Sequence, residues 1–288
     1  MDTYLRNIKR LRKVKHTLPI PPQDHTWLNS KSLLKWFDEQ PLNIRRHLAT
    51  ASVVALTVYG KTSRDWKKRQ TEAMHEFDDF RNRRELTDKQ KKNMPAKGFD
   101  ALKDVIKTMK RELKHILVKP TKEWSFSDLL RVQELVIIAL YADFPLRLDY
   151  ATLSTNNKEK NAIYKNVKKP RGWHIQLTEF KTAASLGTKT FKPNTANQRL
   201  LNKFIPAVLE LTKHGFLLSN QSKQKMSKQV LSKKLMSITK KRIGRAFSVQ
   251  LLRILFAMKN RDVLESAKEV SEKLLHSQKQ SLQYAKKN

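Results

Sequence analysis

Cysteine is absent from this sequence of 288 residues. Its absence excludes a disulfide framework, a thiolate metal site and a cysteine nucleophile. Glycine is scarce, with 6 residues, and no glycine-rich segment precedes the Lys-Ser/Thr pair of a phosphate-binding loop. The longest apolar runs, 53–59 and 135–141, are far shorter than the ~20 residues that cross a bilayer. The first residues lack the apolar core of a signal peptide, so we expect an intracellular protein.

Patterns typical of a metal centre are missing as well. The sequence has no HExxH motif, and its eight histidines are scattered. The neighbouring carboxylates Asp78 and Asp79 lie in a charged segment without a third acidic partner, so we interpret them as part of a solvated helix face. We therefore expect neither a metal nor another cofactor.

Positive charge is what the sequence has in excess. It contains 60 Lys and Arg against 26 Asp and Glu, for a formal net charge of +34 and a pI near 10.4. A surplus of this size repels itself unless a polyanion neutralises it, which favours nucleic acid as the partner. An anionic membrane surface and simple solubilisation are alternatives that charge alone leaves open. The 39% of apolar residues is enough for buried cores, and the length suggests two domains.

The first third of the chain predicts a basic arm followed by a helical region. Residues 1–25 form the arm, which either contacts phosphates, acts as a nuclear address or is a solvated tail. Residues 26–95 predict a helical DNA-binding domain, with helices that begin near Ser30, after Pro41 and at Ser63. The polar segment 86–97 is typical of a linker.

The remainder predicts a second domain that is mainly helical with a small sheet, so the fold class is mainly α with α+β character. Residues 96–121 contain a linker and the first helix, and residues 122–288 the body of the domain. Ser125 and Asp128 have the spacing of a capping box and open an apolar helix that we expect at the centre of the core. β-branched and aromatic residues near 162–164, 173–180 and 188–191, around a turn at 185–187, predict the sheet.

Five residues of this second domain suggest a chemistry when they are taken in order: Arg147, Lys181, Arg253, His276 and Tyr284. His276 follows Arg253 by 23 residues and precedes Tyr284 by 8. Singly they have plainer interpretations, namely a helix-end cation, a solvated lysine, a capping histidine and a tail tyrosine. Arg253 differs, because its apolar neighbours predict that it is buried, and a buried guanidinium needs an anionic partner.

In this order and spacing the five residues resemble the tyrosine recombinase (phage integrase) family, whose catalytic domain carries an Arg, a strand Lys, a His-x-x-Arg motif, a Leu-x-His motif and a Tyr. The segment Pro145-Leu-Arg-Leu-Asp-Tyr150 is similar to the divergent branch found in large DNA viruses, virophages and related mobile elements. The resemblance is close over 122–284. It is looser over 29–95, which is similar to the family's helical core-binding domain. It implies a C-shaped clamp on DNA, in a host nucleus or a viral replication compartment.

The resemblance implies a recombinase that cleaves and rejoins DNA strands without a metal. Tyr284 would be the nucleophile and form a covalent 3′-phosphotyrosine, and Lys181 would protonate the leaving 5′-oxygen. Arg147, Arg253 and His276 would stabilise the charge on the nonbridging oxygens. The partner would be double-stranded DNA, bound by a homotetramer in a synaptic complex, with a monomer in solution.

Two positions depart from the family pattern. Gln250 stands at the first position of the His-x-x-Arg motif, which leaves open whether His276 or a water deprotonates Tyr284. Tyr150 stands where the family often has Glu, and Asp149 could orient Arg147 instead. Two alternatives therefore remain: a type IB topoisomerase-like enzyme that relaxes DNA, and a catalytically inactive basic DNA-binding protein.

Overall fold

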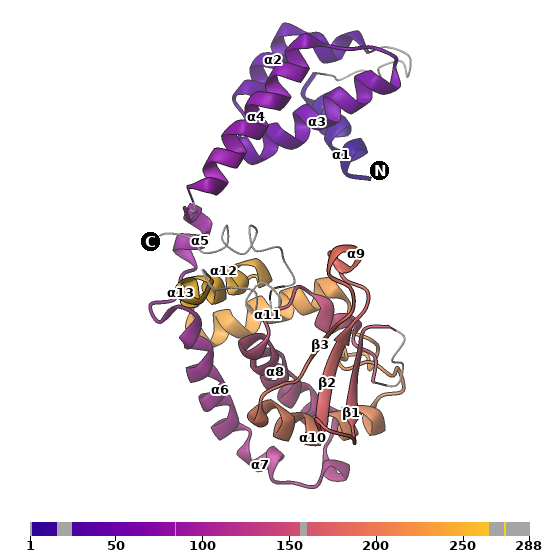
Figure 1. Cartoon of the computed structure of the whole chain (residues 1–288), viewed down its shortest axis with the longest axis vertical. Coiled ribbons are helices and arrows are strands. Elements are labelled where there is room, and N and C mark those ends of the chain that lie inside the picture. The colour runs from indigo at the N-terminus through magenta and orange to yellow at the C-terminus, as the bar shows by residue number, and fades with distance from the viewer. Residues whose placement is uncertain (1, 16–24, 84, 156–159, 265–273, 275–288) are drawn as a thin grey trace. The chain divides into compact units, whose positions relative to one another are not determined.

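The structure is a computed structural model that describes residues 2–15, 25–83, 85–155, 160–264 and 274. Contacts within the chain divide it into two compact units, unit 1 (Met1–Glu85) and unit 2 (Leu86–Asn288). The described residues are mainly helical with a small antiparallel sheet (Figure 1), which confirms the predicted fold class. Among these residues every helix is too short or too polar to cross a membrane.

Unit 1 consists of helices around a small core. Trp66 is fully buried there, its indole N–H donates to the carbonyl of Leu28 at 2.8 Å, and its ring meets Phe37 edge-on. Helix α3 packs against both α1 and α4. The three helices expected near Ser30, after Pro41 and from Ser63 are confirmed. The elements are α1 (Asp2–Lys15), η1 (Thr26–Asn29), α2 (Lys31–Asp38), α3 (Leu42–Val58) and α4 (Arg64–Asn82).

Helix α1 lies in the segment that the sequence suggested as a basic arm. Its Leu11 is fully buried in the core of unit 1, and Ile8 packs against the same cluster. The basic residues of 6–13 are exposed and therefore occupy the outer face of an amphipathic helix that docks on α3. The apolar positions three residues apart are the signal, which the density of Lys and Arg obscured.

Unit 2 is built around α8, which is buried almost all round from Leu135 to Tyr141. Both hydrogen bonds of the predicted capping box between Ser125 and Asp128 are present. Figure 1 shows α8 between α6 and the sheet. The elements are α5 (Asp88–Lys92), η2 (Gly98–Asp100), α6 (Ala101–Glu112), α7 (Lys114–Leu117), η3 (Thr121–Glu123), α8 (Phe126–Asp143), η4 (Asp149–Thr152), β1 (Ala162–Asn166), β2 (Gly172–Leu177), α9 (Ala183–Leu186), β3 (Lys189–Phe191), α10 (Thr195–Leu211), α11 (Lys228–Ile243), α12 (Val249–Lys259) and α13 (Arg261–Leu264).

The segment 86–97, expected as a linker, contains the short helix α5. Thr87 and Gln90 form a complete capping box at its start. Farther along, Met94 packs against the core of unit 2. The Thr-x-x-Gln spacing is a helix signal that the surrounding lysines masked.

The sheet is antiparallel in the order β1-β2-β3, with Ile175 of β2 paired to Ile163 on one side and Phe191 on the other. Strand β2 ends at Leu177, earlier than the predicted 173–180. The reason is Asn161, whose side-chain oxygen accepts the backbone N–H groups of the two residues that follow Leu177, at 2.9 Å each. These donors are therefore withdrawn from the ladder. Lys181 consequently lies in the turn before α9, four residues after the strand rather than at its end.

Candidate active site

A pocket of about 1330 Å³ opens on unit 2 and gathers four of the residues that the sequence singled out. They are Arg147 from the loop after α8, Lys181 from the turn after β2, and Gln250 and Arg253 from α12. The other two, His276 and Tyr284, lie outside the described residues. Four residues that are dispersed in the sequence thus share one cavity.

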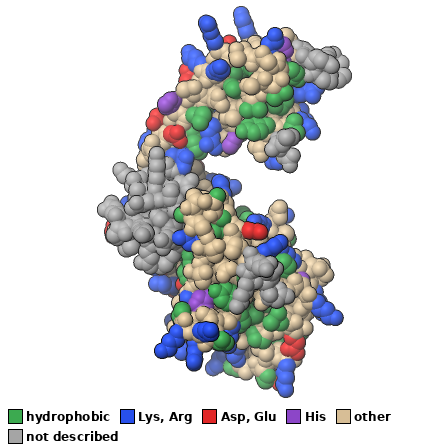
Figure 2. Space-filling view, turned by 45° about the vertical axis from the view of Figure 1, so that its right-hand side comes forward, with side chains coloured by type: hydrophobic (Ala, Val, Ile, Leu, Met, Phe, Trp, Pro, Cys, Tyr) green, Lys and Arg blue, Asp and Glu red, His purple; other side chains and the backbone are tan. Residues whose placement is uncertain are grey.

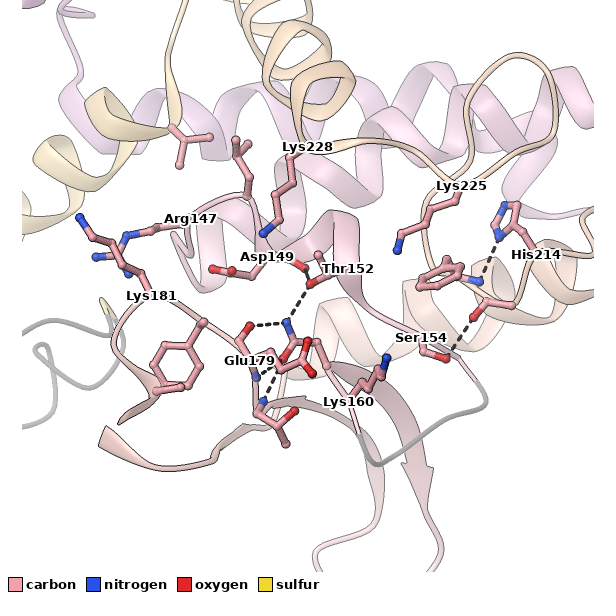
Figure 3. A pocket seen from close by; sticks show the side chains of 18 of the residues that line it. Arg147, Asp149, Thr152, Ser154, Lys160, Glu179, Lys181, His214, Lys225 and Lys228 are labelled. Carbon is pink, nitrogen blue, oxygen red and sulfur yellow. Dashed lines mark hydrogen bonds between the residues drawn. The ribbon is translucent and has the colours of Figure 1, made fainter. Parts of the chain in front are cut away.

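The pocket is strongly cationic. Among the described residues, its lining includes six Lys or Arg side chains and two carboxylates, those of Asp149 and Glu179. Figure 3 shows Arg147 and Lys181 at one end, His214 and Lys225 at the other, and Lys228 close to Asp149 between them. Figure 2 shows that Lys and Arg are spread over the surface of both units, so positive charge by itself does not mark the site. What distinguishes the pocket is that its cations converge on a cavity, where they can hold an anion.

The loop that carries Arg147 is held by two buried tyrosines. The hydroxyl of Tyr141 donates to the carbonyl of Arg147 at 2.8 Å. The single hydroxyl hydrogen of Tyr150 is shared between the carbonyls of Leu140 and Phe144, at 3.0 and 2.7 Å. The two rings meet edge-on with their centroids 4.9 Å apart. Tyr150, the residue at the position where a Glu was considered, thus braces the end of α8 and is not among the residues that line the pocket.

Burial keeps both of these tyrosines protonated. Desolvation raises the pKa of Tyr141, and the nearby charge of Asp149 raises it further, against a lowering by Arg253. Desolvation also raises the pKa of Tyr150 well above its ordinary value, with smaller contributions from Tyr141, Asp143 and Asp149. Each phenol therefore remains a hydrogen-bond donor, and the bonds that position Arg147 persist across the accessible pH range.

Arg253 is buried, as its apolar neighbours predicted, with 2% of its surface exposed. Its guanidinium donates to two backbone carbonyls, that of Pro145 at 3.1 Å and that of Leu274 at 2.6 Å. The first bond ties α12 to the loop of Arg147, 108 residues away in the sequence. The second ties it to a residue that precedes His276 by two positions. A guanidinium carries five N–H groups in a rigid fork, so it can organise the backbone and face a ligand at once.

Asp149 is the buried carboxylate of the site, with 4% exposure. Burial raises its pKa, and the positive charges of Lys228, Arg147 and Arg253 partly oppose that rise. Among the described residues its Oδ2 atom has no hydrogen-bond partner. The surrounding cations therefore act on this carboxylate through space, where they oppose the burial that favours its neutral form.

The residues at the far end of the pocket were not found from the sequence. Phe216 donates its backbone N–H to Nδ1 of His214 at 3.0 Å, and Nε2 of His214 lies 2.7 Å from the hydroxyl of Ser219. The ring is therefore neutral with its proton on Nε2, and burial, followed by the charge of Lys225, lowers its pKa. The ammonium of Lys225 sits 3.7 Å from the centre of the Phe216 ring. In a chain with 60 Lys and Arg, no local pattern separates Lys160, Lys225 or Lys228 from the other lysines.

No family model matches this chain, and no curated protein matches its sequence. Among solved structures, it is similar to the XerH site-specific recombinase bound to its difH substrate in a pre-cleavage complex. The TM-score is 0.56 with 12% sequence identity, over 99% of this chain and 74% of that chain. The XerA recombinase is matched at a TM-score of 0.44 and 12% identity, over 100% of this chain and 94% of that chain. At such identity the likeness to XerH establishes the fold alone.

Proposed function

We propose that this chain, which has the fold of the tyrosine recombinases, is a site-specific DNA recombinase that cleaves and rejoins strands through a covalent 3′-phosphotyrosine. The observation that carries the proposal is the pocket of unit 2, where Arg147, Lys181, Gln250 and Arg253 line one cationic cavity. The similarity to a site-specific recombinase whose structure contains its difH substrate supports double-stranded DNA as the partner. The net charge of +34 supports the same partner, because each phosphate contact releases counterions.

In the proposed reaction the hydroxyl oxygen of Tyr284 attacks the phosphorus of the scissile phosphodiester. The bond from phosphorus to the 5′-oxygen breaks, and the phosphate stays on the 3′ end as an ester of the tyrosine. The phenolic proton leaves to His276 or a water, and Lys181 supplies a proton to the departing 5′-oxygen. Arg147 and Arg253 would contact the nonbridging oxygens, whose negative charge grows in the transition state. Rejoining is the reverse reaction with a 5′-hydroxyl as the nucleophile.

The hydrogen bond between Arg253 and the carbonyl of Leu274 supports a role for the C-terminal segment at this pocket. Leu274 is fully buried and precedes His276 by two residues. We therefore propose that His276 belongs to the phosphate-binding group and that Tyr284 is delivered to the same cavity.

The test is whether Tyr284 becomes linked to DNA. The protein is incubated with a pool of nicked duplexes of randomised sequence, in which cleavage releases a short fragment and traps the intermediate. A DNA adduct that survives denaturation is expected with the wild-type protein and is abolished by Tyr284→Phe. Tyr164→Phe, which changes a tyrosine of β1 outside the pocket, serves as the matched control and retains the adduct. An adduct formed by the Tyr284→Phe protein contradicts the proposal.

The DNA sequences recovered from the adduct, called the selected sequences, then distinguish recombination from its alternatives. Two duplexes that carry a selected sequence are expected to exchange strands through a four-way junction. Relaxation of a supercoiled plasmid without that sequence would instead indicate a type IB topoisomerase. DNA binding with no adduct on any sequence would indicate an inactive DNA-binding protein.

A further inference from the structure

Asn161, which no motif singles out, joins the two halves of the pocket. We propose that it is the positioning residue that holds Lys181 in line with the phosphate bound by Arg147, an inference that rests on the proposed function. It acts through the backbone on either side of the pocket rather than by touching the DNA.

The side-chain amide of Asn161 uses its entire hydrogen-bonding capacity within the protein. Its Oδ1 atom accepts the backbone N–H groups of Thr178 and Glu179, both at 2.9 Å. Its Nδ2 atom donates to the carbonyl of Glu179 and to the hydroxyl oxygen of Thr152, both at 2.8 Å. An amide has two donors and two acceptor lone pairs, so every site is occupied. With 3% of the residue exposed, water does not compete for these bonds.

These four bonds connect the segments that carry Arg147 and Lys181. Thr152 ends η4, which begins two residues after Arg147, and its hydroxyl donates to the carbonyl of Asp149 at 2.7 Å. Glu179 precedes Lys181 by two residues in the turn that follows β2. The hydrogen bonds are the dashed lines beside Thr152 and Glu179 in Figure 3. One side chain thereby fixes the spacing between the Arg147 loop and the base of the Lys181 turn.

Lys181 needs such support because of where it stands. Its side chain is exposed and unbranched, and β2 has already ended at Leu177. Proton transfer requires the ammonium within about 2.6–3.2 Å of the leaving oxygen. A displacement of the turn therefore lowers the protonation of the leaving group while leaving the arginine contacts in place.

The experiment compares single-turnover cleavage of ordinary DNA with that of DNA in which sulfur replaces the bridging 5′-oxygen at the scissile position. A thiolate leaves without being protonated, since a thiol has a pKa of about 8.5. We expect Asn161→Ala to slow cleavage of ordinary DNA by about 10²-fold, the lower range for a lost proton transfer. On the sulfur-containing DNA, the Asn161→Ala protein should cleave at a rate within a few-fold of the wild-type rate. Lys181→Ala should behave in the same way, whereas Arg147→Ala should stay slow on both substrates.

Two further variants keep the test decisive if Asn161→Ala is poorly folded. Thr152→Val is nearly isosteric and removes one of the four bonds, so it should give a smaller loss of cleavage that sulfur also restores. Asn197→Ala is the matched control, since Asn197 is a buried amide that donates to the carbonyl of Ala139 and to Asp143 away from the pocket. It should lower thermal stability without a sulfur-dependent change in rate.

Equal losses on both substrates for Asn161→Ala and Thr152→Val would overturn the inference, as would unchanged cleavage of ordinary DNA. Either result leaves the proposed function intact, because the wild-type adduct is still formed. A wild-type protein that forms no adduct on either DNA would overturn the proposed function and this inference together.

Discussion

Unit 1 and unit 2 both pair charged side chains at the surface, but among the described residues only unit 2 also buries an arginine. In unit 1 the guanidinium groups pair at the surface between helices: Arg45 with Glu76 at 2.8 Å, and Arg69 with Asp38 at 2.7 Å. In unit 2 Arg253 is buried and hydrogen-bonded to backbone carbonyls of two distant segments. An exposed pair exchanges readily with water, whereas each hydrogen bond of a buried cation replaces a water that cannot reach it.

The cations behind the net charge of +34 therefore fall into two groups, those of the surface and those of the pocket. If surface cations serve to neutralise phosphates, one Lys or Arg on the surface of either unit can substitute for another. The cations of the pocket depend on position, because tyrosines, an asparagine and backbone carbonyls hold the segments that carry them. Substitutions in the two groups of cations should therefore differ in their effect on DNA cleavage.

The largest effects are expected at the two pocket arginines. Arg147→Ala and Arg253→Ala should each slow DNA cleavage by about 10²–10³-fold, the usual loss when one donor to a developing oxyanion is removed. Arg253→Ala should also lower the free energy of unfolding by about 3 kcal/mol, because two carbonyls lose their donor in the interior. Arg147 is half-buried, so its variant should unfold close to wild type. Single-turnover cleavage and urea unfolding measure the two effects.

The surface residue Arg171 on unit 2 provides the control for these variants. It is exposed and lies outside the lining of the pocket, so Arg171→Ala should cleave at the wild-type rate. All three proteins should bind DNA with similar affinity at one fixed salt concentration. A parallel loss of binding and cleavage in the pocket variants would make these arginines ordinary phosphate contacts.

Removal of the Tyr150 hydroxyl should have the next largest effect. Tyr150→Phe leaves two carbonyls at the end of α8 without this donor and should lower the free energy of unfolding by about 1–2 kcal/mol. Cleavage should also slow, since the same hydroxyl braces the loop of Arg147. Unfolding in urea and single-turnover cleavage test both points. A stable variant with slow cleavage would indicate instead that Tyr150 acts on the chemistry.

The surface ion pair between Arg69 and Asp38 in unit 1 should contribute less than about 1 kcal/mol to the free energy of unfolding. Arg69→Met removes its bidentate contact with Asp38, at 2.9 and 2.7 Å, and should leave DNA cleavage unchanged. The small loss of stability should shrink further in high salt, as measured by urea unfolding at two ionic strengths. A decrease of more than about 2 kcal/mol in the free energy of unfolding would contradict the view that this surface pair contributes little.

The smallest effect concerns pH. Burial lowers the pKa of His214 below its ordinary value of 6.5, so the unfolded chain binds the proton first as the pH falls. The contribution of His214 to the free energy of unfolding is therefore complete above pH 6.5, and it is lost as the pH falls from there through the folded-state pKa. His214→Gln should flatten this decline in thermal unfolding curves.

His47 offers the corresponding comparison in unit 1, since burial and the charge of Arg46 also lower its pKa. His47→Gln should flatten the decline in the transition that belongs to unit 1. If neither variant changes the decline in stability at low pH, groups other than these two histidines cause that decline.

Sequence patterns predicted the parts of the fold that depend on neighbours along the chain. The periodic apolar residues of α2, α3 and α8 and the capping box at Ser125 are local signals, and each has the predicted structure. Helix α1 was taken for an arm and α5 for a linker, because lysines and arginines outnumber the few apolar or capping residues that specify them. The end of β2 could not be predicted, since it depends on a side chain that precedes β1.

The candidate site was predicted in part. Arg147, Lys181, Gln250 and Arg253 were identified from their order in the sequence, and they line one pocket. Asn161, Lys225, Lys228 and His214 were not identified, because each is ordinary in composition and gains its significance only from segments that lie elsewhere in the chain. Whether His276 and Tyr284 complete the site remains a prediction, for which the adduct test is the measurement.

Composition and local patterns were enough to give the charge that favours a polyanionic partner, the mainly helical fold class, the central apolar helix and the burial of Arg253. These properties depend on composition or on residues close together in the sequence, and they do not depend on which distant segments meet in the fold. Two connections are visible only in the folded chain: Arg253 anchors the loop of Arg147, and Asn161 ties that loop to the turn of Lys181. Hydrogen bonds between distant segments produce no periodic pattern in the sequence, because tertiary packing decides which residues come close enough to form them.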